Sequence, residues 1–163
     1  MPALRYTGIP AELADEVRRT QRSPQYGHPA HRERAQGYGP CRLCLRTFAV
    51  GEEDRILFTY QPFSEPGSLP SPGPVFIHAA QCERFDATKV PEDFRDLPLV
   101  IEGFRAGGML AVQVRVDGSE APEAVVADVF ARTGVDYAHI RNGEAGCFMA
   151  RIERDGSGEP PRP

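Results

Sequence analysis

The sequence contains no tryptophan, only one lysine and no long apolar run. Without tryptophan, the hydrophobic core must be built from the nine phenylalanines and the aliphatic side chains. No segment approaches the roughly eighteen consecutive apolar residues that a membrane-spanning helix needs. Residues 1–5 also lack the apolar core of a signal peptide. These absences exclude a membrane-spanning protein and predict a cytoplasmic location.

The overall composition is that of a soluble globular domain. Of 163 residues, 40% are hydrophobic and 26% are charged, which excludes disorder of the whole chain. The 19 basic and 23 acidic residues give a net charge of −4, which disfavours a nucleic acid as partner. Four cysteines in a chain without an export signal are expected to be thiols, available for metal binding or chemistry, rather than disulfides.

The N-terminal half has few periodic signals. Proline at a first helical position, followed by early acids and late arginines, predicts a short surface helix over 10–20. The Pro-, Gly-, His- and Arg-rich segment 23–40 predicts an irregular structure, and His28 and His31 within it favour a solvated loop over an additional ligand pair. Residues rich in β-formers predict strands over 55–63 and 75–79, separated by an exposed loop.

The C-terminal half has clear periodicity. Alternating hydrophobicity, a helical stripe of valines and two turn signals predict two hairpins around a helix, with strands over 99–105, 109–117, 135–141 and 146–153 and the helix over 119–133. The predicted fold is therefore α+β, with a mainly antiparallel sheet and a C-terminal β-β-α-β-β unit behind an irregular N-terminal half. We expect a single domain over 1–154 and a disordered tail over 155–163.

Two pairs of side chains have the spacing of metal ligands. Cys41 and Cys44 lie three residues apart, and 33 residues later His78 is followed four positions on by Cys82. Three thiolates with one imidazole form an established tetrahedral zinc set, and soft sulfur ligands in a closed shell favour zinc over other metals. We expect a structural zinc ion within segment 40–85, since four protein ligands leave no position for water. The alternative is that these residues are ordinary thiols and a hydrogen-bonded histidine.

The surroundings of these ligands suggest further details. Arg42, Arg46 and Arg84 flank them in sequence and are candidates to donate to the sulfurs of a cluster with net charge −1. The order of a Cys pair on a turn, strand material and a second pair is similar to treble-clef zinc modules. In those modules, the second pair opens a helix, whereas the helix signal after Cys82 is weak.

A second group of polar residues lies at the end of the predicted sheet: Tyr137, His139, Arg141, Asn142 and Cys147. The first three alternate onto one face of their strand, which is either a ligand pocket or a solvated face. A two-residue turn at Asn142 would place residue 148 on that face, whereas a three-residue loop would place Cys147 there. In the second case, a thiol would lie beside an imidazole, an arrangement suited to nucleophilic or redox chemistry.

Five sequence blocks resemble those of an uncharacterised bacterial family, domain of unknown function 1203: GPCRLCLR (39–46), GE (51–52), GPVFIHAAQC (73–82), YAHIRN (137–142) and GCF (146–148). The resemblance extends to about residue 154. It implies a bacterial single-domain protein with no assigned activity. It also implies that eight residues are the motif positions of the family: Cys41, Cys44, His78, Cys82, His139, Arg141, Asn142 and Cys147.

The sequence thus predicts a small zinc-binding module whose metal staples the irregular half to the sheet, and which binds a protein or small-molecule partner. The alternative is a thiol-based enzyme or redox protein. Its reactive group would be Cys147 with His139, or the dithiol of Cys41 and Cys44. A Cys-x-x-Cys pair outside a βαβ unit disfavours a thioredoxin-like mechanism.

Overall fold

The computed structural model describes residues 3–65 and 67–156. The order of its elements is β1 (Leu4–Thr7), α1 (Ala11–Thr20), β2 (His31–Arg34), β3 (Asp54–Tyr60), β4 (Gly73–His78), β5 (Asp86–Ala87), the 3-10 helix η1 (Glu92–Phe94), β6 (Leu99–Arg105), β7 (Met109–Val116), α2 (Pro122–Ala131), β8 (Tyr137–Asn142) and β9 (Phe148–Arg154).

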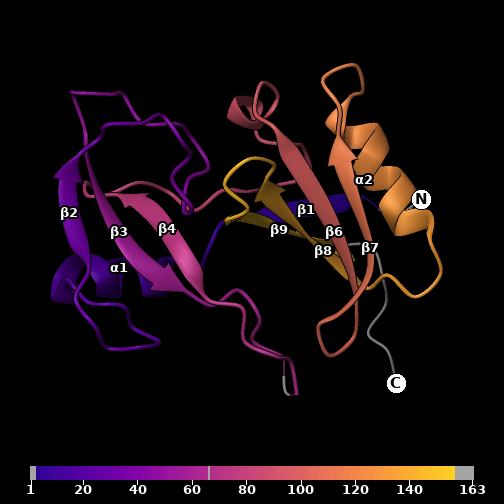
Figure 1. The fold of residues 1–163 in the computed structure, drawn as a ribbon, viewed down its shortest axis with the longest axis horizontal. Coiled ribbons are helices and arrows are strands. Elements are labelled where there is room, and N and C mark those ends of the chain that lie inside the picture. Colours follow the sequence, from indigo (N-terminus) through magenta and orange to yellow (C-terminus); the bar gives the residue numbers. More distant parts are fainter. Residues whose placement is uncertain (1–2, 66, 157–163) are drawn as a thin grey trace.

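The C-terminal half forms most of a six-stranded sheet with the order β5-β1-β9-β8-β6-β7, in which every pairing is antiparallel. Helix α2 lies against this sheet (Figure 1). Gly103 of β6 permits this packing, since a Cβ there would lie 2.8 Å from a methyl group of Val129. The predicted α+β class and the β-β-α-β-β unit are therefore confirmed.

The N-terminal half forms a smaller, three-stranded antiparallel sheet with the order β2-β3-β4. Helix α1 lies beside it and buries Ala14 and Val17 in a second hydrophobic cluster (Figure 1). That cluster also contains Phe148 of β9, whereas Leu45 of the N-terminal half belongs to the cluster beneath α2. Each half of the chain therefore contributes a side chain to the hydrophobic cluster of the other.

Three strands, β1, β2 and β5, lie where no strand was predicted. β2 falls inside the segment expected to be irregular, and its four residues, His-Arg-Glu-Arg, are mostly exposed. Backbone hydrogen bonds pair it with β3. Its side chains show no hydrophobic alternation, which is the sequence signal that would have indicated a strand. β1 crosses to the large sheet and pairs with both β5 and β9. Most of the predicted disordered tail, residues 157–163, lies outside the described residues, whereas Asp155 donates its backbone N–H to the carbonyl of Ala3.

The face of β8 that carries Tyr137 and His139 is buried rather than solvated. His139 is fully inaccessible, and neither ring nitrogen has a hydrogen-bond partner. Its ring is surrounded by four aromatic rings at centroid distances of 4.9–5.5 Å, those of Phe63, Phe104, Tyr137 and Phe148. Burial, with smaller contributions from the charges of Arg151 and Arg141, lowers the pKa of His139 to about 3. The histidine is therefore held neutral in the fold.

This burial predicts an acid-sensitive contribution to stability. Since the folded pKa lies below the ordinary value of 6.5, the unfolded chain binds the proton first, and stability present above pH 6.5 is lost as the pH falls towards 3. Between pH 8 and pH 5 the expected loss is about 2 kcal/mol of the free energy of unfolding. His139→Leu should remove this component. Denaturant unfolding of both proteins at each pH measures it, because acid effects elsewhere are common to both. An equal loss in the variant would contradict the prediction.

Candidate metal centre

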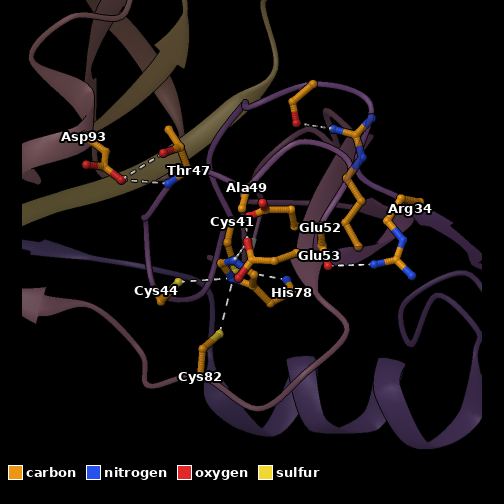
Figure 2. A network of polar contacts seen from close by, with 12 residues as sticks. Arg34, Cys41, Cys44, Thr47, Ala49, Glu52, Glu53, His78, Cys82 and Asp93 are labelled. Atoms are coloured by element: carbon orange, nitrogen blue, oxygen red, sulfur yellow. Dashed lines mark hydrogen bonds and ion pairs between the residues drawn. The ribbon is translucent and has the colours of Figure 1, made fainter.

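The structure brings both predicted ligand pairs together (Figure 2). The ligand atoms of Cys41, Cys44, His78 and Cys82 all lie within 4.8 Å of one another. The Cys41 and Cys82 sulfurs are 3.9 Å apart, and the Cys44 sulfur is 3.4 Å from Nδ1 of His78. Cys41, Cys44 and His78 are buried, and Cys82 is half-buried. Residues separated by as many as 41 positions thus point their donor atoms at a common point.

These separations fit a tetrahedral metal shell. With metal–sulfur bonds of about 2.3 Å and metal–nitrogen bonds of about 2.0–2.1 Å, a tetrahedron places two sulfurs about 3.8 Å apart and a sulfur and a nitrogen about 3.6 Å apart. The observed values of 3.9 Å and 3.4 Å are close to both. A buried set of three thiols and one imidazole can therefore hold a metal ion without rearrangement of the backbone.

A tight turn positions the first pair. Leu45 adopts the left-handed conformation (φ 59°), and the backbone N–H of Leu45 donates to the carbonyl of Cys41. The N–H of Cys41 donates in return to the carbonyl of Arg46, which closes the loop. We call residues 41–46 the knuckle. A third bond, from the N–H of Arg42 to the carbonyl of Phe76, fixes the knuckle to β4.

The second pair comes from the end of β4 and the loop that follows. His78 is the last residue of β4, and its backbone N–H lies 3.3 Å from the Cys41 sulfur. Cys82 lies in an extended segment that leads to β5. No helix follows Cys82 before η1 in the described chain, so the treble-clef resemblance is limited to the arrangement of the knuckle and strand.

The electrostatics of the cluster favour a bound cation. Burial, together with its sulfur neighbours, raises the pKa of the Cys41 thiol. Hydrogen bonds from Cys41 and Cys82 lower the pKa of Cys44, and the Cys44 sulfur raises the pKa of His78 to about 10. Without a metal, the thiols and the imidazole share protons through hydrogen bonds. A divalent cation would displace these protons, since ligands must be deprotonated to bind.

Groups around the cluster orient its ligands. Nε2 of His78 lies 3.2 Å from Oε2 of Glu53, which also accepts the backbone N–H of Ala49 (Figure 2). This leaves Nδ1 of His78 facing the sulfurs, the carboxylate–histidine–metal arrangement of many metal sites. From α1, Arg18 donates to the Cys82 sulfur at 3.3 Å and to the carbonyl of His78 at 3.1 Å.

Of the three arginines predicted to assist the sulfurs, one does so. The Cys44 sulfur raises the pKa of Arg46 through a side-chain hydrogen bond. Arg84 instead donates to the carbonyl of Gly8, and Arg42 extends away from the cluster to Cys147. Sequence spacing did not reveal the contributions of Arg18 and Glu53, because both reach the cluster through tertiary packing. The chain carries no motif that indicates either one.

The second predicted group of residues is divided in the structure. Tyr137 and His139 are buried, whereas Arg141 forms an ion pair with Glu102 at 3.1 Å. Asn142 holds the hairpin loop by accepting the backbone N–H groups of residues 144 and 145. Four residues separate Asn142 from Cys147, and a bulge follows, so that the ring of Phe148 contacts His139. Cys147 is therefore not paired with His139, and the two do not form a thiol–imidazole site.

The remaining polar groups have structural partners. His31 of β2 lies 3.5 Å from Glu33, and Arg32 and Arg34 both form ion pairs with Asp54. The two arginine contacts tie β2 to the start of β3, as expected for surface groups rather than ligands. Beside Cys44 and Cys82, a cavity of about 700 Å³ opens towards β5 and η1. The cluster thus lies directly beneath a surface hollow.

Comparisons with other proteins identify a family for this chain but no individual relative. No curated protein and no solved structure matched the chain. Within the described residues, no helix is long and apolar enough to cross a membrane. A family model matches residues 38–154, which include all four residues of the cluster as well as Arg141, Asn142 and Cys147. The chain therefore belongs to the family described as protein of unknown function (DUF1203).

Proposed function

We propose that this is a small cytoplasmic zinc-binding protein whose metal is structural and whose folded surface acts as a binding module. The observation that carries the proposal is the convergence of three cysteine sulfurs and one histidine nitrogen within 4.8 Å. Three soft donors and an imidazole favour zinc over oxygen-seeking cations. Four cysteines without a disulfide between them suit a reducing compartment.

A structural role follows from the closed ligand set. Four protein ligands satisfy tetrahedral zinc, so no position is left for a catalytic water. The knuckle also lies where several segments meet: Ile9 donates its N–H to the carbonyl of Arg42, and Phe85 donates to that of Leu43. A metal at this point would fix the segment before α1, the end of β4 and the approach to β5. Its contribution would be to hold the small sheet in place against the large one.

The first test is the metal itself. Elemental analysis of the purified protein should give about one zinc per chain. Cys41→Ser should abolish retention of the metal, because a buried hydroxyl is a poor replacement for a thiolate. Cys147→Ser is the matched control, since its sulfur lies outside the cluster, and it should retain the metal. A wild-type protein without metal, in which Cys41 and Cys44 are rapidly alkylated, would instead support a dithiol function.

The second test concerns Glu53. Glu53→Gln keeps an oxygen that can accept from Ala49 but removes the charge that faces His78. Loss of such an outer carboxylate lowers metal affinity by about 10–100-fold, and the lower end is expected here because the Glu53 side chain is 43% exposed. Competition with a chromophoric chelator measures the affinity. Glu52→Gln, a neutralisation at the neighbouring residue, should leave the affinity at the wild-type value, and an equal loss in both variants would rule out a specific role for Glu53.

The third test is local protection from hydrogen exchange. Chelation of the metal should first increase exchange of backbone amides in residues 40–85, which depend on the cluster for closure. Amides in residues 99–153 should stay comparatively protected, because the β-β-α-β-β unit has its own hydrophobic cluster. Mass spectrometry with and without chelator resolves the two regions. Uniform protection in both states would argue against a metal staple.

A further inference from the structure

One cysteine lies outside the metal cluster. Cys147 ends the hairpin loop before β9 and is half-buried. It borders a cavity of about 300 Å³ whose wall also includes the rings of Tyr60 and Phe148 and the side chain of Val75. The cavity is large enough for a small organic molecule, and its aromatic wall suits one with an apolar body. Cys147 is the cysteine among the residues that line this cavity.

A buried guanidinium holds the Cys147 sulfur. Arg42 is only 4% exposed, and its Nη2 donates to the sulfur at 3.0 Å. Its other donors bind the carbonyls of Phe148 at 2.6 Å and Pro40 at 2.5 Å, which fix the plane of the guanidinium. In the described part of the chain, no carboxylate forms an ion pair with Arg42. A buried guanidinium is stabilised by an anionic partner, and among the described residues the acidic side chain that accepts a hydrogen bond from Arg42 is the Cys147 thiol.

The hydrogen bonds of the Arg42 guanidinium are directed away from the sulfurs of the metal cluster. The Cys82 sulfur instead accepts a hydrogen bond from Arg18, and the Cys44 sulfur raises the pKa of Arg46. Although Arg42 lies between two ligands in sequence, its side chain extends in the other direction, to the start of β9. The knuckle thus positions the backbone of Arg42, while its guanidinium lies against the sulfur of Cys147. The thiolate is the reactive form of cysteine.

We propose that Cys147 is a thiol–disulfide exchange site that accepts one half of a small-molecule disulfide with an apolar or aromatic body, with Arg42 as the residue that positions and stabilises its thiolate. This goes beyond the structural role proposed for the metal. The Cys147 thiolate attacks one sulfur of the disulfide, a new S–S bond forms as the old one breaks, and the second half leaves with the electron pair as a thiolate. The Cys147 sulfur is oxidised, and the departing half is reduced. The leaving thiolate takes a proton from water according to its own acidity.

The product is a mixed disulfide rather than an internal one. The three remaining cysteines converge on one another around His78, whereas Cys147 is held by Arg42. While the three sulfurs are metal ligands, none is free to displace the acquired group. The modification would therefore persist until an external thiol reverses it, and it would fill the cavity beside Tyr60.

The test uses the intact, zinc-loaded chain and dithiobis(nitrobenzoate), an aromatic disulfide that releases coloured thionitrobenzoate. One equivalent should be released rapidly, and peptide mass mapping should place the adduct on Cys147. The rate should exceed, by about tenfold or more, the rate per thiol of the same chain unfolded in guanidinium, where Arg42 and the cavity are lost. A native rate no faster than the unfolded rate, or a first adduct on Cys44 or Cys82, would overturn the proposal.

Variants separate the contributions. Cys147→Ser should abolish the rapid release, and Arg42→Gln should slow it by about tenfold, whereas Arg42→Lys, which keeps the charge, should slow it less. Arg19→Gln, a matched loss of one positive charge on the exposed side of α1, should have the wild-type rate. Zinc content is measured on every sample. Unchanged zinc with a slowed rate in Arg42→Gln supports the positioning role, and an unchanged rate contradicts it. If Arg42→Gln does not fold, the release rates of the native and the unfolded wild-type chain still decide whether Cys147 is an exchange site.

The failure of this proposal is distinguishable from failure of the metal proposal. A chain without zinc that still gives a rapid adduct on Cys147 refutes only the metal role. A chain with one zinc and a slow Cys147 refutes only the exchange site. Glutathione disulfide, a small polar disulfide, serves as the second probe, and a preference for it over the aromatic probe would contradict the apolar recognition assigned to Tyr60 and Phe148.

Discussion

The structure depends on one electrostatic constraint, the burial of three thiols and an imidazole at mutual distances below 5 Å. Such groups cannot all ionise in a region of low dielectric unless a cation joins them, because each thiolate raises the cost of the next. Burial raises the pKa of Cys41, while the Cys44 sulfur favours the protonated form of His78. A divalent metal would resolve this conflict, since it would replace the protons and attract every ligand at once.

The position of the cluster explains why the constraint matters for the whole fold. Neither sheet alone encloses the knuckle, whose backbone exchanges hydrogen bonds with the segment before α1, with β4 and with the approach to β5. Leu45 packs into the cluster beneath α2, and Phe148 of the large sheet packs into the cluster of the small one. Fixing the knuckle therefore fixes the contact between the two halves. Entropy lost on ordering the long loop between Cys44 and His78 is offset at the same place.

The sequence predicted the parts of the fold that carry a repeating hydrophobic signal. The alternation in β7 and the valine stripe of α2 sufficed for the β-β-α-β-β unit. The spacing of two residue pairs, Cys41 with Cys44 and His78 with Cys82, sufficed for the four residues of the cluster. Prediction from the sequence failed for β2, because backbone hydrogen bonds pair this strand with β3 and its charged side chains show no repeating pattern. Arg18 and Glu53 could not be predicted, since their contacts with the ligands arise only from how α1 and the β3 approach pack. The position of Cys147 depended on a loop length and a bulge that Asn142-Gly143 alone does not determine.

Arg42 connects the two thiol chemistries of this chain. Its backbone belongs to the knuckle, which a metal held by Cys41 and Cys44 would order, whereas its guanidinium donates to the sulfur that lies outside the cluster. One set of sulfurs would be balanced by a metal ion and the other sulfur by a buried arginine. Because the arginine is held between two ligands, loosening of the knuckle would withdraw the cation from Cys147 and expose the carbonyl of Phe148 that it binds. A metal bound by the knuckle is therefore expected to affect the reactivity of Cys147 through a single side chain.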